Sequence, residues 1–413
     1  MSVFDASVSR RDVGKAALAV TATVAVPAPI LRLASAQDAA TPVGEDAGMG
    51  LPPLPEGATV VAEGLYNPRF LAFGDDGTLY ITENGVGGDE VVPGPGGTNE
   101  GEATPVTGAE ATPVEEPPMP PSTRGYTGQV SAVAPDGTQS VLASGLASYS
   151  DGVGPVGIAL GAGAVYFSIG GVAVGAGFPP LPEENTVNKL DLATGEVTIV
   201  TELGPYEEAN NPDGTDVNPN LYEMAVTAEG ALLVTDAGGN TVYSVNSETG
   251  EFALLGIVPD LTALTGVEPE AGQPARQPVP TGLDVAGDGT VYVGLLSEFW
   301  EGPSVLTWSA DGTFAPVGGP LSFNVGITVG PDGWIYATEL FGMVEGSEQP
   351  GPGRVVRMNP ADGTIEPVVE GIMMPHGTAF DAEGNLYVAI NSLMSGPGMP
   401  AGQVIRIDGV AAV

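Results

Sequence analysis

The sequence predicts an all-β fold built from one repeated unit, and three observations support this. A turn glycine between two short apolar strands returns along the chain, as in "DGTLYITEN" at 76–84 and "EGNLYVAIN" at 383–391. A second hairpin with an Asp-Gly or Thr-Gly turn follows each of the first five pairs, which gives four strands per unit. No long helical periodicity follows the N-terminal segment. Such four-stranded repeats are typical of a β-propeller, and six turn glycines predict six blades: Gly77, Gly163, Gly230, Gly289, Gly333 and Gly384.

The N-terminal segment 1–36 has the pattern of an export signal. "SRRDVGK" at 9–15 is close to the twin-arginine motif, and an apolar run at 16–31 leads to a small-residue exit ending at Ala36. An amphipathic helix or a membrane anchor is the alternative, which the two prolines of the short apolar run disfavour. We therefore expect cleavage after Ala36 and a location in the periplasm, the cell wall or outside the cell, with no later segment spanning a membrane.

The remaining chain divides into a spacer and the propeller. Residues 37–57 are rich in Pro, Gly and Ala, and 58–413 hold the six blades. The last blade ends one strand short, after "GQVIRIDG" at 402–409, while "ATVVAEGL" at 58–65 has the pattern of a fourth strand and stands outside blade one. Pairing the two would close the ring and remove its exposed edges. We expect a monomer.

Blade one contains a long acidic insertion at 85–125. It carries "EATPV" twice, at 102–106 and 110–114. A segment of this composition cannot bury a core, so the sequence predicts disorder there.

Charge and cysteine content exclude several classes of function. The 413 residues include 51 acidic and 11 basic ones, a formal net charge of −40, and removal of the signal would take away four of the basic residues. Phosphate-rich partners would be repelled, which argues against nucleic acids and anionic membrane surfaces. Because the chain has no cysteine, disulfides, thiolate metal sites and a cysteine nucleophile are excluded.

The long connections of the predicted blades all fall on one face, which we call the loop face. Such loops on a repeated scaffold are the usual place for binding, and we expect a small molecule, a glycan or a protein to bind there. Glu83, Asp236 and Glu339 end strands at one aligned position on this face. They are either a ring of carboxylates around the channel or, as we favour, corner groups that hydrogen-bond the next turn.

The starts of the innermost strands should rim the central channel. Arg69 is one of few basic residues in the propeller and His376 is the only histidine. Their convergence with other polar groups would indicate a site, with His376 as the candidate catalytic group, whereas an Arg69–Glu223 structural ion pair is the alternative. The predicted ligand-binding residues are Arg69, Tyr222, Glu223, Thr281, Asn324 and His376.

A loop at 210–220, "NNPDGTDVNPN", is dense in oxygen donors. Asp213 and Asp216, with Glu223 and Asn324, are candidate ligands for calcium, which prefers such oxygens. The spacing matches no EF-hand, and Asn-Pro-Asp-Gly is also ordinary turn chemistry, so both interpretations stay open.

Several stretches resemble one family, the ScyD/ScyE proteins. They include "GLYNPRFLAFGDDGTLYITENGVGGDE" (64–90), "ANNPDGTDVNPNLYEMAV" (209–226) and "PHGTAFDAEGNLYVAIN" (375–391). The resemblance covers about 57–409 and implies an exported six-bladed propeller without assigned catalytic residues. The chain is also distantly similar to NHL-repeat and gluconolactonase-like propellers. That similarity implies a divalent metal at the channel, with Glu223 and Asn324 nearest to the ligand positions.

The sequence alone leaves three possible functions open. The first is an exported binding or scaffold protein that acts through the loop face. The second is a calcium-dependent lactonase or esterase with His376 as base, and the third is a quinoprotein-like dehydrogenase with His376 and Arg69 around a quinone. One histidine and one arginine are few for a metal or cofactor pocket, which favours the first.

Overall fold

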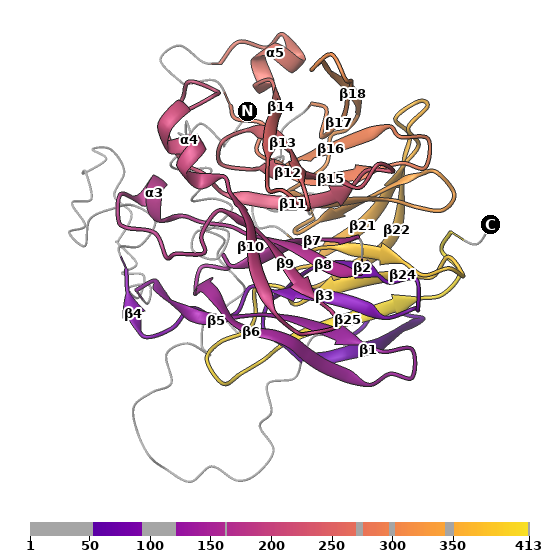
Figure 1. Ribbon diagram of the computed structural model, residues 1–413. Helices are drawn as coiled ribbons and strands as arrows, with labels where there is room; N and C mark the ends of the chain where they lie inside the picture. Colours follow the sequence, from indigo (N-terminus) through magenta and orange to yellow (C-terminus); the bar gives the residue numbers. More distant parts are fainter. Residues whose placement is uncertain are drawn as a thin grey trace, which may run out of the picture.

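The inner strands of six antiparallel sheets contact one another in cyclic order and form a closed ring. A computed structural model describes residues 53–92, 121–161, 163–269, 276–296, 302–342 and 351–411. Within these residues the innermost strand of each blade contacts that of the next blade. The contacts run from β2 to β7, β11, β15, β19 and β23, and from β23 back to β2. The predicted all-β, six-bladed propeller is confirmed (Figure 1). The predicted signal segment 1–36 and residues 37–52 of the spacer lie outside the described residues.

Each blade is an antiparallel meander of four strands placed in order from the innermost to the outermost, and blade one has an additional short strand. The strands of blades one to five are, in order, β2 (Pro68–Phe73), β3 (Leu79–Glu83), β5 (Thr123–Val133) and β6 (Gln139–Tyr149); β7 (Pro155–Gly161), β8 (Ala164–Ile169), β9 (Thr186–Asp191) and β10 (Val197–Glu202); β11 (Leu221–Val226), β12 (Ala231–Asp236), β13 (Thr241–Asn246) and β14 (Phe252–Ile257); β15 (Pro280–Val285), β16 (Val291–Leu295), β17 (Val305–Trp308) and β18 (Phe314–Gly318); β19 (Asn324–Val329), β20 (Ile335–Glu339), β21 (Gly353–Met358) and β22 (Ile365–Ile372).

The sixth blade joins the two ends of the chain. It consists of β23 (Thr378–Phe380), β24 (Leu386–Ile390), β25 (Gly402–Ile407) and β1 (Ala58–Leu65). Strand β1 pairs antiparallel with β25, from Ala58 opposite Ile407 to Leu65 opposite Gly402, and the two labels lie side by side in Figure 1. The predicted closure by the N-terminal strand is therefore confirmed.

The predicted disordered insertion at 85–125 is wrong at both of its ends. A short strand, β4 (Glu90–Val91), pairs with the start of β5 at Thr123 and Arg124. Glycines allow this pairing, because a Cβ on Gly88 would lie only 2.7 Å from the Cα of Gly125. Residues 93–120, which hold the repeated "EATPV", lie outside the described part of the chain.

Hydrophobic cores fill the spaces between neighbouring blades. Between blades two and three, for example, Tyr166 of β8 and Tyr243 of β13 are buried in one cluster. Since both faces of a central strand are covered in this way, β3, β8 and β20 are buried along their whole length. The apolar stacking of blades on each other holds the ring together.

The long connections lie on one side of the blades, as the sequence predicts. Three of them contain short helices: α3 (Ala173–Ala176), α4 (Gly204–Asn210) and α5 (Leu261–Thr265), all outside the blades in Figure 1. Among the described helices, none has the length and apolar character needed to cross a membrane. The starts of the innermost strands face this same side, which places the predicted site at the mouth of the channel.

Candidate functional site

The strand-ending carboxylates are corner groups. Glu83, Asp236 and Glu339 are fully buried. Each accepts a hydrogen bond from a backbone N–H that lies one or two residues before the first strand of the same blade. This bond fixes how the chain enters the blade. The pairs are Glu83 with Tyr66 N at 2.6 Å, Asp236 with Asn220 N at 2.8 Å, and Glu339 with Ser322 N at 2.5 Å.

The amide that follows the first of these carboxylates holds an arginine. Asn84 accepts a hydrogen bond from Arg69 Nε and donates from Nδ2 to the Pro155 carbonyl at 2.8 Å. Arg69 Nη2 donates to the Gly152 carbonyl at 2.6 Å. The guanidinium therefore lies where blades one and two meet, with its side chain 4% exposed.

Arg69 does not form the ion pair with Glu223 that the sequence left open. Its hydrogen bonds go to an amide and a carbonyl, and among the described residues no carboxylate lies within ion-pair distance of it. Burial lowers the pKa of Arg69 to about 10, while the neighbouring Tyr222 acts in the opposite direction. The guanidinium therefore stays charged at neutral pH, as a buried cation without a counterion among the described side chains.

Two further predicted residues lie beside this cation. The Tyr222 hydroxyl and His376 Nε2 are hydrogen-bonded at 2.9 Å, and their rings stack with centroids 5.8 Å apart. His376 is fully buried. Burial, and then the charge of Arg69, lower the pKa of His376 well below its usual value, and burial raises the pKa of Tyr222. Both side chains are neutral at neutral pH.

Phe70 fills the channel next to these rings. Its ring meets His376 edge-on with centroids 4.9 Å apart and lies 6.1 Å from Tyr222. It reaches across to blades five and six, because a Cβ on Gly326 would lie 2.7 Å from Phe70 Cε1 and one on Gly377 would lie 2.6 Å from its Cα. Phe70 thus replaces the glycine that four other blades carry at this position.

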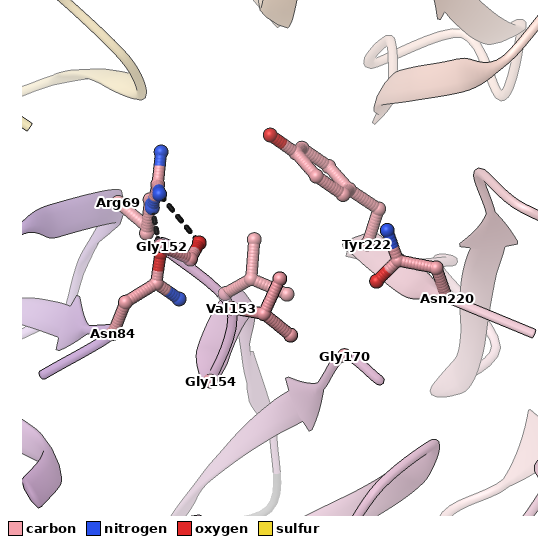
Figure 2. A pocket seen from close by; sticks show the side chains of 9 residues that line it. Arg69, Asn84, Gly152, Val153, Gly154, Gly170, Asn220 and Tyr222 are labelled. Carbon is pink, nitrogen blue, oxygen red and sulfur yellow. Dashed lines mark hydrogen bonds between the residues drawn. The ribbon is translucent and has the colours of Figure 1, made fainter. Parts of the chain in front are cut away.

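A small pocket opens beside Arg69 and Tyr222 (Figure 2). Its volume of about 20 Å³ is room for one water or one small polar group, far less than the several hundred Å³ of pockets that enclose a whole ligand. Its lining includes Arg69, Asn84, Gly152, Val153, Asn220 and Tyr222.

Glu223 belongs to a different group, with a residue that the sequence did not single out. Its Oε1 accepts the Met224 N–H at 3.0 Å, and within the described chain its Oε2 has no hydrogen-bond partner. Burial, with the nearby Asp284 adding to it, raises the pKa of Glu223 well above its usual value. Burial also raises the pKa of Asp284 to about 6. The aligned inner-strand position is Ala or Thr in the other five blades, a signal that could have found Asp284.

The remaining predicted site residues tie blades four and five together. The Thr281 hydroxyl donates to the Asn324 carbonyl at 2.8 Å, and Asn324 Nδ2 donates to the Ser304 carbonyl at 3.4 Å. Neither residue lines the pocket. The structure therefore brings Arg69, Tyr222 and His376 together and leaves Thr281 and Asn324 outside. Sequence reasoning missed Asn84 and Gly152, since nothing local marks them as neighbours of Arg69. It considered Asn220 only as an oxygen donor of the 210–220 loop for a cation, and not as part of this pocket.

The candidate calcium ligands are dispersed over different local contacts. Asp213 Oδ1 accepts the Thr215 N–H at 3.1 Å, and its Oδ2 accepts from Asn240 Nδ2 at 2.8 Å. Within the described ranges, no three His, Asp or Glu side chains converge as metal ligands do. The calcium site on Asp213, Asp216, Glu223 and Asn324 stays a prediction.

The fold and the channel place the chain among the six-bladed β-propellers. A gluconolactonase from Xanthomonas campestris is similar with a TM-score of 0.50 and 13% identity, over 84% of this chain and 88% of that chain. Virginiamycin B lyase from Staphylococcus aureus is similar with a TM-score of 0.44 and 15% identity, over 84% and 97% of the two chains. No protein-family model and no curated protein matches the sequence. At such identities the likeness concerns the fold alone, and the ScyD/ScyE resemblance stays a prediction.

Proposed function

We propose that this chain is an exported ScyD/ScyE-like binding protein that holds a small ligand at the channel mouth on its loop face. One observation carries the proposal: Arg69 is a buried cation that lines a pocket and has no carboxylate partner among the described residues. Removing a charge from water costs several kcal/mol unless it is compensated. A bound ligand with a complementary group would supply that compensation.

Backbone strain at the same mouth supports a binding role. Three bulky residues have positive φ angles next to the polar rim positions of blades four to six. They are Val279 (φ 49°), two residues before Thr281; Phe323 (φ 45°), directly before Asn324; and Met374 (φ 43°), two residues before His376. Bulky residues rarely adopt this left-handed conformation, which costs about 1–3 kcal/mol each and is found preferentially at ligand clamps and active sites. The three side chains pack in one apolar cluster that Tyr222 and Leu393 also contact.

Binding fits the site better than the calcium-dependent lactonase or esterase. The base of such an enzyme would be His376. Burial, and then the charge of Arg69, lower the pKa of this histidine. A general base works best when its pKa lies near the working pH, and protonating this imidazole beside a guanidinium is unfavourable. A quinoprotein-like dehydrogenase fits less well still, because a pocket of about 20 Å³ does not enclose a quinone cofactor.

The proposal is tested with the purified exported protein and a panel of small molecules from four classes: carboxylates, amines, sugars and neutral amides. At least one class is expected to raise the melting temperature, because a ligand that binds only the folded state stabilises it. Arg69→Gln is expected to remove the response, whereas Arg406→Gln, a matched change at an arginine of blade six that pairs with Asp408 away from the pocket lining, keeps it. A wild type that responds to no class refutes the proposal. Hydrolysis of δ-gluconolactone that is lost in His376→Ala would favour the lactonase instead.

A further inference from the structure

We infer that the group held in this pocket is the carboxylate of a small organic molecule. The inference rests on the proposed function and names the chemistry of its ligand. It follows from the hydrogen-bonding groups that the pocket leaves without partners, from its charge and from its size.

The pocket presents donors that are not in use. Arg69 donates from Nε and Nη2, and within the described part of the protein Nη1 has no acceptor. Figure 2 shows this third nitrogen pointing away from Asn84 and Gly152, on the side toward which the Tyr222 hydroxyl extends. The amide nitrogen of Asn220 also lacks a described acceptor, while its oxygen accepts the Gly171 N–H at 3.3 Å. Two N–H groups therefore remain for a ligand.

The Tyr222–His376 pair contributes another donor to the pocket in one tautomer of the imidazole, because Tyr222 lines the pocket. When Tyr222 donates to Nε2, the imidazole proton is on Nδ1, which has no partner among the described residues. When Nε2 donates to Tyr222, the phenol proton is free instead. A neutral pair has two protons and one shared bond, so one donor is left over, and it is in the pocket lining when it is the Tyr222 hydroxyl.

The side-chain and carbonyl acceptors nearest to Arg69 are already occupied. Asn84 Oδ1 and the Gly152 carbonyl accept from Arg69, and Asn220 Oδ1 accepts from Gly171. An amine would bring only donors and a charge that Arg69 repels, and a sugar hydroxyl needs an acceptor as well as a donor. Free donors beside a buried cation suit an oxygen anion.

Charge and size select a carboxylate among oxygen anions. The chain carries a formal net charge of −40, so a dianion such as phosphate would be repelled more strongly than a monoanion. A volume of about 20 Å³ admits a head group, and the rest of the molecule would lie on the loop face. A Cβ on Gly152 would lie 2.6 Å from Arg69 Nη2 and 2.8 Å from Leu393 Cδ2. An apolar side chain thus lies beside the cation, where an apolar ligand body would rest.

The test compares matched probes by calorimetry and thermal shift: acetate, phenylacetate, phenylacetamide and inorganic phosphate. Phenylacetate is expected to bind at least about tenfold more tightly than its neutral amide, since a hydrogen bond to a charged group contributes roughly 1.5–3 kcal/mol and each 1.4 kcal/mol is tenfold. Phosphate is expected to bind more weakly than phenylacetate. If phenylacetate binds more tightly than acetate, the natural ligand has an apolar body. If the two bind with equal affinity, the natural ligand is a small free carboxylate.

The variants separate the carboxylate chemistry from a purely structural role. Arg69→Gln is expected to remove the preference for acid over amide, and Arg406→Gln to keep it. Tyr222→Phe retains the ring packing and is expected to lower the affinity for phenylacetate several-fold. This variant keeps the test usable if Arg69→Gln does not fold. An amide that binds as tightly as the acid, or a preference unchanged in both pocket variants, overturns the inference. Sugars or amines that bind in an Arg69-dependent way overturn it while the proposed binding function stands.

Discussion

Replacing Asp284 with asparagine is expected to stabilise the protein at neutral pH. Burial raises the pKa of this carboxyl from 3.8 to about 6 in the folded state. As the pH rises from about 4 to about 6, the unfolded chain loses this proton before the folded chain does, so the folded state becomes relatively less stable. Above about pH 6 the loss is complete. A shift of about two units corresponds to roughly 3 kcal/mol.

The substitution retains part of the local hydrogen bonding. Asp284 Oδ2 accepts the Val329 N–H and Oδ1 accepts the Val285 N–H, both at 2.7 Å. Asparagine keeps one acceptor oxygen, so one of these bonds is lost at a cost of about 1 kcal/mol. The net expectation is a gain of about 1–2 kcal/mol at pH 7.5 and none, or a small loss, at pH 4.

Urea unfolding at pH 4, 5, 6 and 7.5 measures this difference through the midpoint at constant slope. Asp288→Asn is the matched control in the same blade, because hydrogen bonds from Thr290 lower the pKa of that exposed carboxyl. Its contribution is present above the unfolded pKa and is lost as the pH falls, so the control is expected to destabilise slightly at neutral pH. A variant Asp284→Asn that is less stable at pH 7.5, or a difference that does not change with pH, would refute the reasoning.

Four further outcomes are expected. Deleting 58–65 should lower the melting temperature and cause aggregation through exposed strand edges, whereas deleting 98–115 should leave melting almost unchanged; equal losses would contradict ring closure. Glu339→Gln should destabilise by about 1–3 kcal/mol in urea, because this buried carboxylate accepts from Ser322 N and Arg354; no change would argue against the corner role. If the rim binds calcium, calcium should raise the melting temperature of the wild type and not of Glu223→Gln; a wild type that does not respond removes the calcium hypothesis. Replacing Arg10 and Arg11 with Lys should trap precursor in the cell, and Gln37 should be the N-terminus of the exported protein; unchanged export contradicts the twin-arginine prediction.

The candidate site was predictable in part. Residue rarity and the alignment of inner strands identified Arg69, Tyr222 and His376, which do meet at the mouth. The same alignment included Thr281 and Asn324, whose side chains point into contacts between blades. A strand position fixes which ring level a residue occupies, but its rotamer and the space left by its neighbours decide whether it faces the channel.

The sequence by itself determined the six blades, the closure by β1 and the corner carboxylates. These follow from signals within one hairpin or one repeat: turn glycines, alternating apolar residues and an acid at a strand end. Only the tertiary structure decided the partners of Arg69, which are Asn84, 15 residues away, and Gly152, 83 residues away, and not Glu223. It likewise decided that Glu223 lies near Asp284. A ring brings six strand starts to one small mouth, so many pairings are possible there, and packing rather than spacing selects among them.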